Sequence, residues 1–159
     1  MPIQQATAHT HEPGAGLNGL ATSATVHCLT GCAIGELVGM AIATAFGWGN
    51  VPQLALAIAL AYTFGFGLTA MPLVKAGLAA GVVVSTALAA DTVSITIMEA
   101  IDNLTVVVWP GAIDAGLDDA LFYASIAGGF AIAFPFAWLA NRYMIARGTG
   151  HAVVHQYHH

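Results

Sequence analysis

The sequence predicts an all-α, polytopic membrane protein that crosses the bilayer four times. Hydrophobic residues make up 58% of the 159 residues and charged residues only 7%, against about 25% charged residues in an ordinary globular domain. Three basic and eight acidic side chains are too few to cover the surface of a soluble protein of this size. Apolar runs of about 20 residues, the length that crosses a hydrocarbon core, recur along the chain. The net charge of −5 excludes nucleic acid as an expected partner.

The expected transmembrane domain covers residues 24–147 and contains four spans, at about 25–48, 52–71, 73–103 and 118–147. The first span ends at "GWGNVP", a turn sequence, and the second begins with a proline in its first turn. The third span is expected to begin near Pro72, and Pro135 is expected to kink the fourth. Residues 104–117 are apolar and interrupted by proline and glycine, which is compatible with a loop or with a re-entrant segment.

The three basic residues predict the orientation of the chain. Lys75 lies between the second and third spans, and Arg142 and Arg147 lie at the end of the fourth. In a four-span protein these positions share one side with the N-terminus, and positively charged loops stay in the cytoplasm. We therefore expect a protein of the bacterial inner membrane whose N-terminal segment, residues 1–23, and C-terminal tail, residues 148–159, are both cytoplasmic.

Glycines at every fourth position form one face of the first predicted helix. Gly31, Gly35 and Gly39 share this face, and small residues at that spacing let a second helix approach closely in lipid. The face is expected to serve as a packing or oligomer contact. If subunits meet there, one helix from each would surround the axis of a homo-oligomer.

The neighbouring face of the same helix carries side chains that bind soft metal ions. In the stretch "HCLTGCAIGELVGM", Cys28, Cys32, Glu36 and Met40 recur at spacing four, and His27 adjoins the first of them. Thiolate, imidazole and thioether ligands favour copper first and zinc second. The alternative is that the sulfur-containing side chains only fill space between helices. Glu36 favours the first interpretation, because a carboxyl about 12 to 15 Å into the bilayer is costly there and usually functional.

A second polar face is predicted on the third span, within "ADTVSITIMEAIDN". Asp91, Met98 and Asp102 share this face, and Glu99 lies at its border. The chain has too few basic residues to pair with these acids, so they are expected to be protonated, hydrogen-bonded, hydrated or bound to a cation. We expect an ion path along them, although solvation at the outer interface also accounts for Asp102.

Histidines in the C-terminal tail are candidate metal ligands on the cytoplasmic side. In "GHAVVHQYHH", His151 and His155 lie four apart, a spacing at which two imidazoles on a helix chelate one metal ion. The alternative is that the tail is disordered, or that the last two histidines belong to an affinity tag.

The motifs "HCLTGCAIGE", "MEAIDN", "PGAIDAGLDDALF" and "NRYMIARGTGHAVVHQYHH" together resemble a family of small bacterial membrane proteins known only as a domain of unknown function. The resemblance covers the chain from about residue 27 to its end. It implies a four-helix membrane domain and an association with copper-handling systems, but no activity. It assigns no role to the residues that fall within its motifs, which are His27, Cys28, Cys32, Glu36, Glu99, Asp102, Asp114, Asp118, His151 and His155.

The expected function is binding, with conduction or export, of a soft transition metal ion through a path lined by Cys, His, Glu and Met. One alternative is a proton or small-solute channel gated by the intramembrane carboxylates, and another is a metal-sensing or assembly scaffold that transports nothing. An enzyme is not expected, because the sequence contains no P-loop, nucleophile elbow, HExxH motif or dinucleotide fingerprint.

Overall fold

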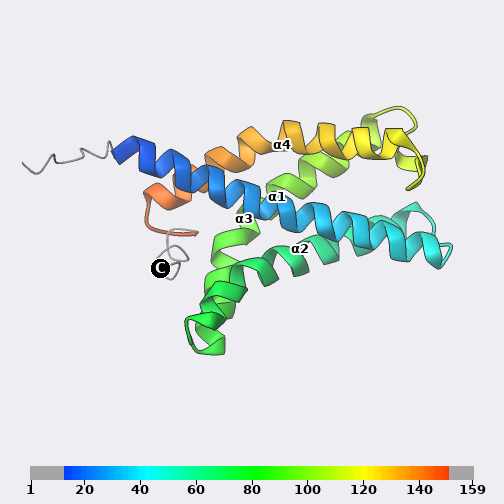
Figure 1. Ribbon diagram of the computed structural model, residues 1–159. Helices are drawn as coiled ribbons and strands as arrows, with labels where there is room; N and C mark the ends of the chain where they lie inside the picture. Colours follow the sequence, from blue (N-terminus) through cyan, green and yellow to red (C-terminus); the bar gives the residue numbers. More distant parts are fainter. Residues whose placement is uncertain (1–12, 151–159) are drawn as a thin grey trace, which may run out of the picture.

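The computed structural model describes residues 13–150, and within this range the chain forms four long α-helices and no strand (Figure 1). Each long helix is long and apolar enough to cross a membrane. The prediction of an all-helical protein with four helices long and apolar enough to span a membrane is therefore confirmed. The elements, in chain order, are α1 (Pro13–Ala45), α2 (Asn50–Lys75), α3 (Ala80–Val108), the short 3-10 helix η1 (Ala112–Asp114) and α4 (Ala120–Ala146).

The first helix begins well before the predicted residue 25, at Pro13. Its additional turns pack against the end of α4, where Ala21, Ala24 and Ile145 form a small buried cluster. The Trp138 Nε1–H of α4 also donates to Thr22 Oγ1 of this segment at 3.0 Å. Contacts with α4 thus accompany the helical turns that precede the predicted start of the span.

The break between the second and third helices also lies later than predicted. Pro72 is inside α2, which continues to Lys75. The turn that follows contains Gly77, whose positive φ of 77° is the left-handed conformation that commonly terminates helices. Likewise, α3 continues to Val108, so residues 104–108 are helical and only the remainder of 104–117 is a connection, which contains η1.

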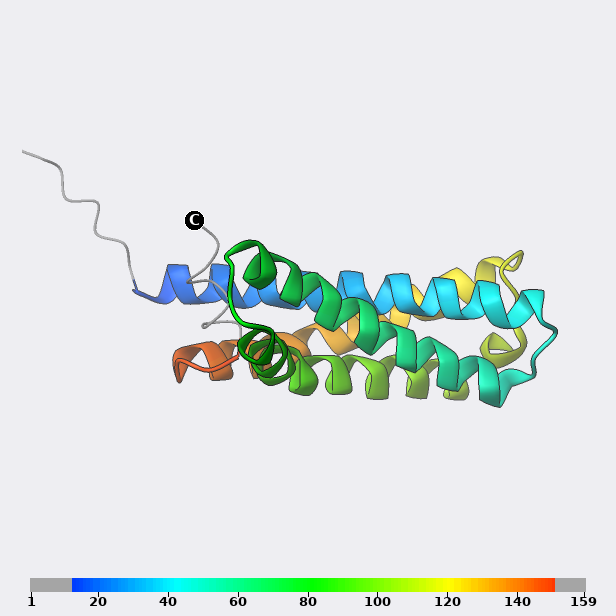
Figure 2. The same cartoon turned by 90° about the horizontal axis from the view of Figure 1, so that it is seen from below.

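The helices pack as two antiparallel hairpins, α1 with α2 and α3 with α4, and these hairpins also contact each other (Figures 1 and 2). The start of α1, the α2–α3 turn and the end of α4 lie at one end of the bundle. The α1–α2 turn and η1 lie at the other end. All three basic residues therefore belong to the same end as the described chain ends, as the sequence predicts.

The glycine face of α1 is a packing surface within the chain. A Cβ on Gly31 would lie 2.6 Å from Gly65 Cα of α2, and one on Gly39 would lie 2.6 Å from Ala57 Cα. At Gly35 a Cβ would overlap the Ala61 backbone. Because α2 occupies this face, it is not available to surround the axis of an oligomer, and that part of the prediction is corrected.

Candidate functional site

The polar side chains of α1 and α3 meet along the interior of the bundle. The two helices run in the same direction (Figure 1). Residues four apart lie on one face of α1, and each successive one of them therefore meets a residue further along α3. The Cys28 thiol donates to Asp91 Oδ1 at 3.6 Å. Cys32 packs in the same buried cluster as Met98 and has Glu99 as its nearest acid. We call the residues Cys28, Cys32, Glu36, Asp91, Met98, Glu99 and Asp102 the α1–α3 ladder.

The far end of the ladder is formed by carboxyl groups. Asp102 and Glu99 are the acidic neighbours of Glu36. Glu36 and Asp102 lie within hydrogen-bonding reach of each other, as do Glu99 and Cys32. Apart from these contacts, both carboxyl oxygens of Glu36, Oε1 of Glu99 and Oδ1 of Asp102 are buried without a hydrogen-bond partner in the described structure. Buried polar atoms are normally hydrogen-bonded, and those that are not call for an explanation such as an ion or a water molecule. Along the helix axis, Cys28 and Glu36 are separated by about 12 Å.

No lysine or arginine side chain enters the ladder. Lys75 and Arg147 are exposed, and the partly buried Arg142 donates through Nε to Asn18 Oδ1 at 2.8 Å. Arg147 lies over the ring of Tyr143. These are the only three Lys and Arg residues of the chain. The interior acids are therefore not compensated by lysine or arginine, which makes the ladder suited to a cation or to protons.

The structure does not gather all the predicted metal ligands into one site. His27 is half-buried, and its Nε2 lies 3.1 Å from Thr69 Oγ1 of α2. Met40 lines a pocket near Glu36, at the other end of the ladder. Within residues 13–150, no group of three or more His, Cys, Asp and Glu side chains has the arrangement of a metal site. His151 and His155 lie outside the described residues.

A buried amide next to the ladder was missed by the sequence analysis. Asn141 of α4 donates through Nδ2 to Thr25 Oγ1 and to Ser94 Oγ, both at 3.0 Å, and joins α4 to α1 and α3. Its position beside Arg142 made it look interfacial. The spacing of residues on α4 could have revealed it. Ala133, Ala137 and Asn141 recur every four residues, so they share one face of the helix, and this face is buried.

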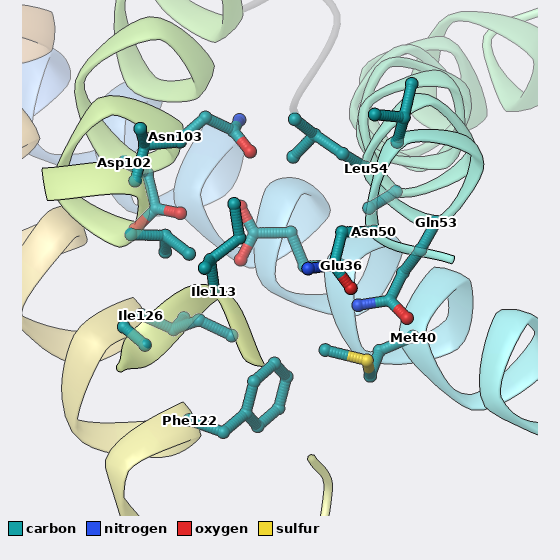
Figure 3. A pocket seen from close by; sticks show the side chains of 15 residues that line it. Glu36, Met40, Asn50, Gln53, Leu54, Asp102, Asn103, Ile113, Phe122 and Ile126 are labelled. Carbon is teal, nitrogen blue, oxygen red and sulfur yellow. The ribbon is translucent and has the colours of Figure 1, made fainter. Parts of the chain in front are cut away.

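A pocket opens beside the carboxyl end of the ladder (Figure 3). Its volume is about 110 Å³, and Glu36 and Asp102 lie on its wall together with Asn103. The Asn103 amide donates through Nδ2 to the Glu99 carboxylate at 3.1 Å. The position of Asp102 depends on Gly129 of α4, since a Cβ there would overlap the Asp102 carboxyl group.

The fold and the ladder define a class, a helical membrane-type protein with thiols and acids in its interior. The chain belongs to the family described as a domain of unknown function (DUF4396), whose model matches residues 19–150. This confirms the family resemblance seen in the sequence. Comparison with curated proteins gives no match, and comparison with solved structures gives none either.

Proposed function

We propose that this protein is a multi-pass protein of the bacterial inner membrane that binds and conducts Cu(I) along the α1–α3 ladder, with both termini in the cytoplasm. The observation that carries the proposal is the pairing of α1 thiols with α3 acids in an interior that no lysine or arginine enters. A cation bound there is held by thiols and carboxyl groups together. Thiolate and thioether ligands then select a soft ion such as Cu(I).

The sulfur atoms of the ladder are the first binding position in this proposal. Cys28, Cys32 and Met98 belong to one core cluster, and each is completely buried. A thiol that binds a metal ion loses its proton. The carboxylate form of Asp91 is placed to receive the proton of Cys28, because the two groups already share a hydrogen bond.

Copper fits this arrangement better than zinc. Structural zinc sites use four ligands in a tetrahedral arrangement, and catalytic sites use three. No such group of His, Cys, Asp and Glu occurs within residues 13–150. A sulfur set that includes a methionine matches Cu(I), which soft thioether ligands favour.

The remaining predicted residues are assigned to the ends of the path. His27, His151 and His155 would collect the ion on the cytoplasmic side, which is the side assigned to the basic residues by the positive-inside rule. Glu36, Met40, Glu99 and Asp102 would then carry it toward the opposite side of the membrane.

The proposal is tested by anaerobic titration of the untagged protein with Cu(I) in competition with a chromogenic chelator. We expect one Cu(I) per chain, lost when Cys28→Ser is combined with Cys32→Ser. Met98→Leu should weaken binding at least tenfold. Met71→Leu is the matched control, because Met71 is 50% exposed on α2. Wild-type protein that binds no copper, or a double variant that retains it, contradicts the proposal.

A second candidate is a proton channel gated by the intramembrane carboxylates, and the buried cluster of Glu36, Glu99 and Asp102 favours it. Flux assays in liposomes separate the two functions. A proton channel keeps its proton flux in the Cys28→Ser/Cys32→Ser variant and loses it in Glu36→Gln. A Cu(I) conductor loses copper flux in the double variant, and stoichiometric copper binding without flux indicates a metal-binding scaffold.

A further inference from the structure

The pocket beside Glu36 lies at the end of the bundle away from the described chain ends, where five elements meet (Figures 1 and 3). Residues of α1, α2, α3, η1 and α4 line this pocket. Asn50 at the start of α2 donates through Nδ2 to Asp114 Oδ1 of η1 at 3.0 Å. This bond joins two of the elements that bound the pocket and keeps η1 beside it.

Most of the pocket wall is apolar. Leu54 of α2 and Val107 of α3 lie on one part of it, and Phe122 and Ile126 of α4 lie on another. Figure 3 shows the Phe122 ring, Ile126 and Leu54 around the space into which the Glu36 side chain extends. A fully hydrated ion gains nothing from such a wall, whereas an organic group buries apolar surface against it.

The polar part of the wall consists of two buried carboxyl groups. Glu36 is 6% exposed and Asp102 is 1% exposed. The two carboxyl groups lie within hydrogen-bonding reach of each other, and the oxygens of Glu36 and Oδ1 of Asp102 have no other hydrogen-bond partner in the described structure. The residues that line the pocket include no Lys, Arg or His. The pair of carboxyl groups thus has unused acceptor capacity and no basic side chain beside it.

Amide groups at the edge of the pocket supply further acceptors. Asn103 uses its Nδ2 as a donor to the Glu99 carboxylate and to the Glu99 backbone carbonyl. Its Oδ1 is therefore the atom of this amide that is left to accept. Figure 3 shows Asn103 above Glu36 and Asp102, with Gln53 on the α2 side. A ligand with several N–H donors on one positively charged nitrogen finds acceptors on more than one side.

We propose that this pocket is a binding site for a small organic cation, a primary ammonium group carried on an apolar or aromatic body. The ammonium lies against Glu36 and Asp102, and the apolar body lies against Leu54, Phe122 and Ile126. Most of the pocket wall is apolar and offers a bare metal ion no ligands, and no metal-type group of three His, Cys, Asp and Glu occurs within residues 13–150. The site shares Glu36 and Asp102 with the far end of the proposed copper path, but it does not depend on the thiols.

The proposal is tested by calorimetric titration of the detergent-solubilised full-length chain with benzylammonium. Benzyl alcohol is the neutral probe of similar shape, and empty micelles give the background from partitioning. We expect saturable binding of benzylammonium and at least tenfold weaker binding of benzyl alcohol. Absence of saturable binding, or equal affinity for the two compounds, overturns the proposal.

Variants locate the site and keep the test independent of folding defects. Glu36→Gln and Asp102→Asn keep the shape of each side chain and should each weaken benzylammonium binding at least tenfold. Leu54→Trp should abolish it by filling the pocket without changing a charge. Asp118→Asn removes an exposed acid from the same end of the bundle and should leave binding unchanged.

Thermal unfolding of each variant, followed by circular dichroism, verifies that it is folded. Unchanged binding in a folded Glu36→Gln protein overturns the assignment. The copper proposal is tested through Cys28 and Cys32. The outcome of the Cu(I) titration therefore does not change the interpretation of benzylammonium binding.

Discussion

Asn141 shows how one amide organises the interior of the bundle. Its Nδ2 bonds to a hydroxyl of α1 and to one of α3, so a single side chain links three helices. In a membrane, hydrogen bonds between helices contribute about 0.6 kcal/mol each on average. Spacing in the sequence places Ser94 on the same face of α3 as Asp91 and Met98. It did not reveal the amide partner, because hydrogen bonding across helices depends on how the helices rotate against each other.

Replacing Asn141 by leucine should lower the free energy of unfolding by about 1 kcal/mol, since two interhelical hydrogen bonds of about 0.6 kcal/mol are lost. The measurement is reversible unfolding in mixed micelles with increasing SDS, followed by circular dichroism. Thr63→Ala is the control, because the Thr63 hydroxyl is exposed and bonds only to the carbonyl of Ala59 in its own helix. Equal stability of the Asn141→Leu and Thr63→Ala proteins would contradict the assigned role.

At the scale of one element, α1 carries two faces with different partners. The glycine face meets α2, and the face with Cys28, Cys32 and Glu36 meets α3. Spacing in the sequence predicts which residues share a face, because residues four apart lie on the same side of a helix. It does not predict which helix covers that face. For this reason the sequence predicts both faces, but it leaves open whether the glycine face packs within the chain or against another subunit.

A matched pair of glycine substitutions tests the packing of α1 on α2. Gly35→Ala should destabilise the protein by about 1 to 3 kcal/mol, because its Cβ overlaps the Ala61 backbone and overpacking forces the helices apart. Gly67→Ala introduces the same methyl group where no atom lies within 4 Å. It should be neutral or stabilising by up to about 1 kcal/mol, because alanine is the better helix former. SDS unfolding compares the two, and equal effects would refute the packing argument.

At the scale of the whole molecule, the number of spans was predictable and several helix ends were not. Long apolar runs determine how many times the chain crosses, because only helices of about 20 apolar residues span a bilayer in this way. The ends depend on contacts that lie far apart in the sequence. Ala21 and Ala24 at the start of α1 pack on Ile145 near the end of α4. No local sequence pattern predicts this contact. At Pro72 a local pattern predicts the wrong helix end. Proline is common in the first turn of a helix, so the pattern predicts a third span that starts near Pro72, whereas this residue lies inside α2.

The orientation of the molecule is tested by cysteines placed at its two ends. Val51 is 80% exposed at the α1–α2 end, and Val74 is 62% exposed at the opposite end. A membrane-impermeant maleimide should label Val51→Cys in intact spheroplasts and Val74→Cys only in inside-out vesicles. The wild-type chain is the control and should stay unlabelled, because Cys28 and Cys32 are completely buried. The reverse pattern would place the basic end outside the cell.

The hydrogen bond between Thr25 and Asn141 joins residues 116 positions apart. A ribosome delivers the chain to the membrane from its N-terminus, so α1 and α2 can associate through their glycine and alanine contacts while α4 is still unmade. Cys28 meets Asp91 only after α3 has entered the bilayer, and Thr25 meets Asn141 only after α4 has followed. The acids and thiols of the interior therefore acquire their partners late in biogenesis, and a chain that stalls after its second span leaves Glu36 in the membrane without the neighbours that the finished protein provides.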